Sequence, residues 1–154
     1  MDQQSYLAAV ERLFEKSEYI TIKKLPVKLL TAPRVDARVS GRLFCFIVRD
    51  AAPDMALCTA LARYALSLSF YDDAERRRKD AVLVLFPVSS LDEGAKALLS
   101  QRCKKIGSAA CLPAVFDLSQ NTLHCARKFP PFGGGEFQSL CTFAHKFLQP
   151  EKEE

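Results

Sequence analysis

The residues best suited to bind a metal ion are two histidines and two cysteines near the end of the chain. His124 and Cys125 are adjacent, while Cys141 and His145 have the spacing that puts both on one face of a helix. Four nitrogen and sulfur ligands could hold zinc in a tetrahedral site. However, neighbours in a strand point to opposite faces, and the chain contains no Cys-x-x-Cys pair. We therefore predict that these residues hold no metal ion.

Nucleophilic catalysis has little support in the sequence. Only two histidines are present, both near the C-terminus, and there is no Gly-x-Ser-x-Gly motif that would indicate a Ser-His-Asp triad. Three consecutive glycines, Gly133 to Gly135, precede a predicted helix but lack the Lys-Ser/Thr of a phosphate-binding P-loop. We interpret them as a flexible connector.

The cysteines indicate the compartment rather than the chemistry. Cys45 lies inside an apolar run, and Cys58 and Cys141 fall on apolar faces of predicted helices, where cysteine acts as a small buried hydrophobe. The chain starts without the basic and apolar segments of a signal peptide. We therefore expect reduced thiols and an intracellular protein, cytoplasmic or nuclear. The six are Cys45, Cys58, Cys103, Cys111, Cys125 and Cys141.

Clustered basic residues are the candidates for binding nucleic acid. The densest group follows the second predicted helix, and a second pair could extend a basic edge. Four acids adjoin the first group and would cancel its charge, so a solvated loop remains the alternative. The candidates are Arg76, Arg77, Arg78, Lys79, Arg127 and Lys128.

Composition excludes several classes of protein. The chain has 154 residues, of which 49% are hydrophobic and 26% charged, with a net charge of +4. These values are typical of a globular domain and not of a disordered or collagen-like chain. No apolar run is long enough to span a bilayer, so we expect no membrane partner. We predict a single domain over residues 1–148 and a polar tail over residues 149–154.

Hydrophobic spacing predicts ten elements. The runs around residues 43–48, 81–86 and 112–118 are continuously apolar, which is typical of strands covered on both faces. A capping box at residues 90–93 predicts the start of the third helix, and Gly107 its end. The predicted helices are 5–16, with Ser5 as N-cap, 53–70, 91–105 and 136–148; the predicted strands are 19–23, 35–40, 42–49, 81–86, 112–118 and 122–127.

The order of these elements is α-β-β-β-α-β-α-β-β-α. Strands buried on both faces and joined through helices form a mixed sheet with helices on both sides. We therefore predict an α/β fold, a three-layer sandwich with a mixed central β-sheet.

Residues 5–88 of this order resemble the core of the restriction-endonuclease-like family, the PD-(D/E)XK nucleases. That family has a catalytic Asp on the second strand and a Glu-x-Lys on the third, which together hold a divalent ion and position water. Asp36 takes the position of the Asp, whereas Ile47 stands where the Glu belongs and Arg49 where the Lys belongs. The segment Ala60-Leu61-Ala62-Arg63-Tyr64-Ala65 is similar to the family's Gln-Leu-x-x-Tyr-Ala pattern.

The resemblance implies a copy that has lost hydrolysis, because isoleucine cannot ligate a metal and arginine stays protonated. We expect a non-catalytic binding domain, an accessory subunit of a larger assembly with protein partners and a role with nucleic acid, needing no cofactor. One alternative is a divergent nuclease that uses Asp36, Asp50 and Glu11 with Mg²⁺. Another is a scaffold that binds only proteins. The simplest interpretation of Asp36 itself is a surface residue paired with Arg38 or Arg49.

Overall fold

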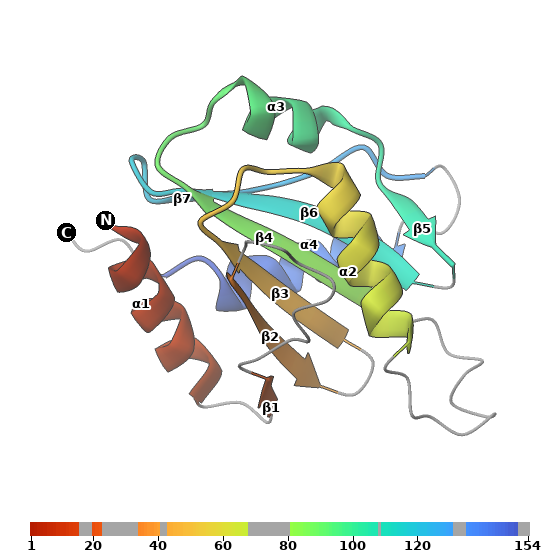
Figure 1. Cartoon of the computed structure of the whole chain (residues 1–154), viewed down its shortest axis with the longest axis horizontal. Helices are drawn as coiled ribbons and strands as arrows, with labels where there is room; N and C mark the ends of the chain where they lie inside the picture. Colours follow the sequence, from red (N-terminus) through yellow and green to blue (C-terminus); the bar gives the residue numbers. More distant parts are fainter. Residues whose placement is uncertain are drawn as a thin grey trace.

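The computed structural model describes residues 1–15, 20–22, 34–40, 43–67, 81–107, 109–130 and 135–150. These residues form a mixed sheet flanked by helices, which confirms the predicted α/β class and element order, with one short strand in addition (Figure 1). The helices are α1 (Gln3–Glu15), α2 (Met55–Ser67), α3 (Glu93–Ser100) and α4 (Gly135–Phe147). The strands are β1 (Ile20–Ile22), β2 (Arg34–Ser40), β3 (Leu43–Arg49), β4 (Ala81–Val88), β5 (Lys104–Ile106), β6 (Ala109–Asp117) and β7 (Thr122–Cys125).

The sheet has an antiparallel part and a parallel part. Strands β1, β2 and β3 pair antiparallel as a meander, and β3, β4 and β6 are parallel neighbours. Parallel strands need a crossover, and the helices α2 and α3 lie in these two connections. Both β5 and β7 pair antiparallel with β6, at opposite ends of that strand. Pro113, which has no N–H to donate, lies between the two paired stretches.

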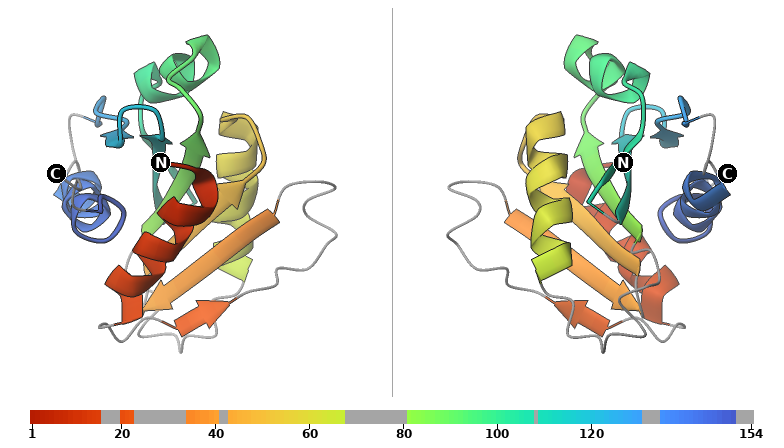
Figure 2. Two further views of the ribbon diagram at one scale, coloured as in Figure 1. Left: turned by 90° about the vertical axis from the view of Figure 1, so that its left-hand side faces the viewer. Right: turned by 90° about the vertical axis from the view of Figure 1, so that its right-hand side faces the viewer.

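The sheet separates two hydrophobic cores. Helices α1 and α4 pack on one face, and α2 and α3 pack on the other (Figure 2). Alternate residues of β3 and β4 enter different cores, so that Ile47 and Leu85 contribute to the first and Phe46 and Phe86 to the second. The middle of each of these strands is buried on both faces, as their continuous apolar runs predict.

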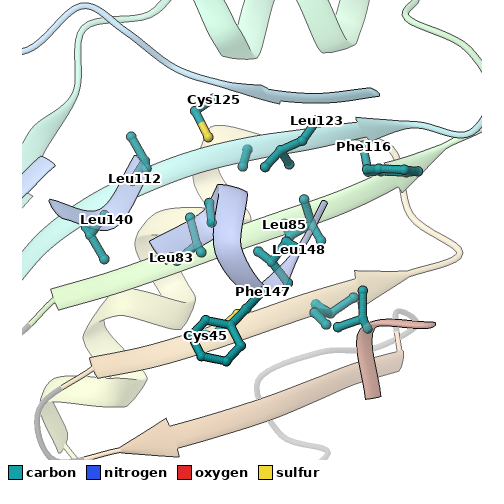
Figure 3. Packing of buried hydrophobic residues seen from close by; sticks show 14 of the residues in the cluster. Cys45, Leu83, Leu85, Leu112, Phe116, Leu123, Cys125, Leu140, Phe147 and Leu148 are labelled. Atoms are coloured by element: carbon teal, nitrogen blue, oxygen red, sulfur yellow. The ribbon is translucent and has the colours of Figure 1, made fainter. Parts of the chain in front are cut away.

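Tyr6 joins α1 to the sheet and to the end of the chain in the first core. Its ring stacks on Phe116 with centroids 3.9 Å apart, and its hydroxyl donates a 2.7 Å hydrogen bond to the carbonyl of Leu148. Leu85, Phe116, Phe147 and Leu148 lie close together in this core (Figure 3). This hydrogen bond replaces those that the hydroxyl would make with water, so the buried hydroxyl is not left unsatisfied.

Two helix boundaries differ from the predictions. Asp2, not Ser5, caps α1, because its carboxylate accepts a 2.7 Å hydrogen bond from the Ser5 amide. Helix α3 begins after Asp92, whose carboxylate accepts from the Ala95 amide at 2.8 Å, and ends at Ser100 rather than near 105. The chain then becomes extended and forms β5. Gly107 therefore does not end a helix; it turns the chain from β5 into β6 with a φ of 60°.

Some predicted features lie outside the described residues. These are the basic run at residues 76–79, the segments 68–70 and 131–134, and the last four residues. Gln149, predicted as the start of a polar tail, accepts a 2.7 Å hydrogen bond from the Leu123 amide and donates to the Asn121 carbonyl. Every helix in the described parts of the chain is too short or too polar to reach across a lipid bilayer.

Candidate functional site

A cleft of about 470 Å³ opens between α1 and the ends of β2 and β3. Its lining comes from three places that are distant in sequence but adjacent in the fold. The lining residues are Gln3, Gln4, Leu7, Ala8, Glu11, Asp36, Ile47, Arg49 and Asp50. All five positions singled out by the sequence for a nuclease-like site therefore meet in one cleft: Glu11, Asp36, Ile47, Arg49 and Asp50.

The antiparallel register of β2 and β3 brings Asp36 and Ile47 together. Their Cα atoms are direct partners across the strand pair, so both side chains stand on the same face of the sheet. That is the face covered by α1, because Ile47 belongs to the first core while Val35 and Ala37 belong to the second. Ile47 is buried and presents only hydrocarbon to the cleft.

Arg49 occupies the same face two residues after Ile47 and neutralises Asp36. The Nη2 atom of Arg49 lies 3.1 Å from Oδ1 of Asp36 and donates a hydrogen bond to it within an ion pair. The side chain of Arg49 is 29% exposed and that of Asp36 is 18% exposed. This confirms one of the two pairings predicted for Asp36. The Nε of Arg49 is buried and has no hydrogen-bond partner among the described residues. The guanidinium thus holds the carboxylate through Nη2, while its Nε–H donor is left without an acceptor among the described residues.

Asp50 ends β3 and turns the chain towards α2. Its φ of 59° lies in the left-handed region, which Asp tolerates better than most residues. Its carboxylate accepts a 3.1 Å hydrogen bond from Nε2 of Gln3, which ties the start of α1 to the end of β3. Glu11 stands exposed on α1 and completes the set of three acids that line the cleft.

The cleft does not fit a divalent cation of the kind that nucleases use. Such a cation needs several oxygen ligands converging on one point. Within the described residues, no group of three His, Cys, Asp or Glu side chains is placed to hold a metal ion. Asp36 already pairs with Arg49, and the position opposite it carries no oxygen. The described residues of the cleft are arranged for ion pairs and hydrogen bonds.

The cysteines are buried thiols rather than nucleophiles. All six are free of disulfides, and five are buried. Burial raises the pKa of Cys103 to about 11 and, together with the neighbouring Cys141, the pKa of Cys125 to about 12. Burial likewise raises the pKa of Cys111 to about 12. A thiol with so high a pKa is protonated at neutral pH and is a poor nucleophile.

A second cleft, of about 610 Å³, lies between the end of β7 and α4. Cys125, Cys141 and His145 line it together with Arg127, whereas His124, the neighbour of Cys125, does not. This separation follows the alternation of side chains along a strand. The remaining lining residues are Phe129, Gln138 and Thr142.

Two predicted nucleic-acid-binding residues, Arg127 and Lys128, are exposed just after β7. The sequence does not assign Arg102 and Lys104 to the same surface, because both fall within the helix predicted over residues 91–105. It also did not identify Gln3, since nothing in a polar first helical turn points to a cleft. Only the long-range pairing of the backbone reveals these neighbours.

No protein-family model, curated protein or solved structure matches this chain.

Proposed function

We propose that this chain is a non-catalytic binding domain, built on a restriction-endonuclease-like frame, that serves as an accessory subunit of a nucleic-acid-handling assembly. The observation that carries the proposal is the cleft under α1. It gathers the positions at which such nucleases keep their catalytic residues, yet it holds Ile47 and an Asp36–Arg49 ion pair there.

The order and pairing of the elements in the first half of the chain support the proposed restriction-endonuclease-like fold. A helix, an antiparallel three-strand meander, a crossover helix and a strand parallel to the third follow one another as α1, β1–β3, α2 and β4. This is the order on which the resemblance rests. The described part of the chain adds α3, β5, β6, β7 and α4 to this core.

Charge supports a role in binding rather than hydrolysis. Three carboxylates and one guanidinium line the cleft, so a phosphate group approaching it would meet an excess of negatively charged side chains. The chain as a whole is nevertheless basic, with a net charge of +4. An anionic partner is therefore better accommodated away from this cleft.

Cleavage assays test the absence of catalysis. Labelled DNA and RNA are incubated with Mg²⁺ or Mn²⁺ and either the wild-type chain or Asp36→Ala. We expect no metal-dependent cleavage by either protein, because Ile47 stands where the family has its metal-binding Glu. Cleavage that disappears with EDTA and in Asp36→Ala would contradict the proposal and favour the nuclease alternative with Asp36, Asp50 and Glu11.

Introducing the family's Glu and Lys at positions 47 and 49 tests the proposed restriction-endonuclease-like fold. In the variant Ile47→Glu/Arg49→Lys, a second carboxylate faces Asp36 across the strand pair, and we expect Mn²⁺ binding by calorimetry that the wild type lacks. The matched control is Leu43→Glu/Arg49→Lys, which adds the same carboxylate to the same face of β3, four residues away. If the restored variant bound Mn²⁺ no better than this control, the nuclease-like frame would be wrong and the scaffold alternative favoured.

A further inference from the structure

Four exposed cations lie on two segments that are distant in sequence but run side by side, and we call them the basic edge: Arg102, Lys104, Arg127 and Lys128. A parallel bridge pairs Arg102 with Lys128, and the amide of Cys103 donates a 2.7 Å hydrogen bond to the carbonyl of Lys128. The segment after β7 runs beside the segment that leads into β5 (Figure 1). The backbone pairing therefore brings together the two segments that carry these residues, with Arg102 and Lys128 as direct partners.

The charge of the basic edge is not balanced within the described part of the chain. All four side chains are exposed, and none forms an ion pair with a described carboxylate. The neighbouring Lys105 differs, since its Nζ lies 3.8 Å from a carboxylate oxygen of Glu136. Because α3 ends at Ser100, the dipole of that helix does not account for Lys104. Such a concentration of free positive charge favours an anionic partner.

The second cleft adjoins the basic edge, because Arg127 lines it. Its other groups include the amide of Gln138, the hydroxyl of Thr142 and the imidazole of His145, all exposed and able to hydrogen bond. Phe129 adds a half-buried ring, held by stacking on Phe137 at 5.7 Å between centroids. An aromatic ring beside cations and hydrogen-bonding groups is the combination with which proteins bind unpaired nucleotides.

We infer that the basic edge binds the phosphodiester backbone of single-stranded nucleic acid and that the adjoining cleft receives an unpaired base. The inference extends the proposed function, on which it rests, by placing nucleic acid on the β5–β7 side of the molecule and not in the Asp36 cleft. A duplex fits less well, because its bases are stacked inside the helix and cannot enter a cleft. A volume of about 610 Å³ is ample for one nucleotide.

Fluorescence anisotropy with labelled single-stranded DNA and RNA tests the inference. Four phosphate contacts predict a slope of about −3 in the logarithm of affinity against that of salt, or a loss of about 50-fold between about 50 and 200 mM. Arg102→Gln/Lys128→Gln removes two contacts, so the slope should fall to about −1.4 and the affinity about tenfold at low salt. Phe129→Leu should weaken single-stranded binding by about tenfold and change the salt slope little.

The matched control is Arg12→Gln/Arg63→Gln, which removes the same charge from exposed positions on α1 and α2. Equal losses in this control and in the basic-edge variant would overturn the inference, as would tighter binding of a duplex of equal length. Equal competition by polyglutamate would also overturn it and indicate an acidic protein partner. These outcomes leave the proposed function standing, whereas metal-dependent cleavage contradicts that function whatever the binding results.

Discussion

At the scale of single residues, Arg49 determines what the cleft under α1 can do. A lysine at this position could lose its proton when buried beside a reacting group, but arginine cannot. Its guanidinium holds Asp36 at 3.1 Å and so occupies the acid of this cleft that lies within a strand. In the proposed restriction-endonuclease-like fold, Arg49 replaces a lysine of nearly the same length and charge, and its ion pair would compete with a metal ion for Asp36.

Because of the buried thiols, we expect the free energy of unfolding to depend on pH in the alkaline range. A thiol in the unfolded chain has a pKa near 9.0, whereas burial raises the pKa of Cys111 to about 12 in the folded chain. Between these values the folded state keeps a proton that the unfolded state has lost, so the free energy of unfolding falls as pH rises above 9.0. Below the unfolded pKa this contribution is fully present.

Urea unfolding of the wild type and Cys111→Ala between about pH 8 and 11 measures this contribution. We expect the variant to lose stability less steeply, by up to about 1.4 kcal/mol per pH unit. Lysines and tyrosines also titrate in this range, but they are common to both proteins and cancel in the comparison. Identical pH dependence in the two proteins would show that the Cys111 thiol does not contribute.

At the scale of elements, Asp117 fixes the turn between β6 and β7. One of its carboxylate oxygens accepts hydrogen bonds from the Ser119 hydroxyl at 2.6 Å, the Ser119 amide at 2.9 Å and the Gln120 amide at 3.2 Å. Burial alone would raise the pKa of Asp117, but these hydrogen bonds outweigh it and the pKa lies below its ordinary value of 3.8. Asn121 completes the turn with a φ of 52°, which asparagine tolerates.

Asp117→Ala should therefore lower the free energy of unfolding by about 1–3 kcal/mol, since three donors lose their acceptor. Asp117→Asn keeps an acceptor oxygen and should lose less. The lowered pKa stabilises the fold above pH 3.8 and this stabilisation disappears as the pH falls through the folded value, so the gap between wild type and Asp117→Asn should narrow in acid. Chemical unfolding at pH 7 and in acid measures both effects, and an unchanged gap would contradict the assignment.

Elements with strong local patterns could be predicted from the sequence, whereas those fixed by distant partners could not. The apolar runs of β3, β4 and β6 require cover on both faces, and this requirement alone indicates the layered fold. Strand β5 is different, because its residues Lys104–Ile106 are largely polar and become a strand by pairing with β6. The end of α3 is hard to predict for the same reason, since the chain becomes extended at Gln101 and the Cys103 amide then donates to the distant Lys128 carbonyl.

The candidate site shows the same division. Alternation along residues 35–40 correctly places Asp36 on a polar face, and the resemblance then pairs it with Ile47. The contact of Gln3 with Asp50 had no sequence signal, because it joins the first turn of α1 to a left-handed residue at the end of β3. Likewise, the basic edge exists only once two segments more than twenty residues apart lie side by side.

At the scale of the whole molecule, the same sheet contributes residues to both cores. A cavity in either core should therefore lower the free energy of one shared unfolding transition. Leu83 faces α4 in the first core, and Leu61 of α2 lies in the second. We expect Leu83→Ala and Leu61→Ala each to cost about 2–5 kcal/mol and to keep a single cooperative transition in urea. Far-ultraviolet circular dichroism and hydrogen exchange of α1 and α2 amides measure this. Separate transitions for the two helices would show that the cores fold independently.

Tyr6 gives this molecule a built-in optical reporter. The chain contains no tryptophan and only four tyrosines, so tyrosine emission is not masked by energy transfer to an indole. The Tyr6 ring is clamped against Phe116, and its phenol is bound to the Leu148 carbonyl, which places one chromophore where α1, the sheet and the final turn of the chain meet. A phenol in so rigid and asymmetric a setting contributes to near-ultraviolet dichroism, and this signal will vanish when any one of those three pieces undocks.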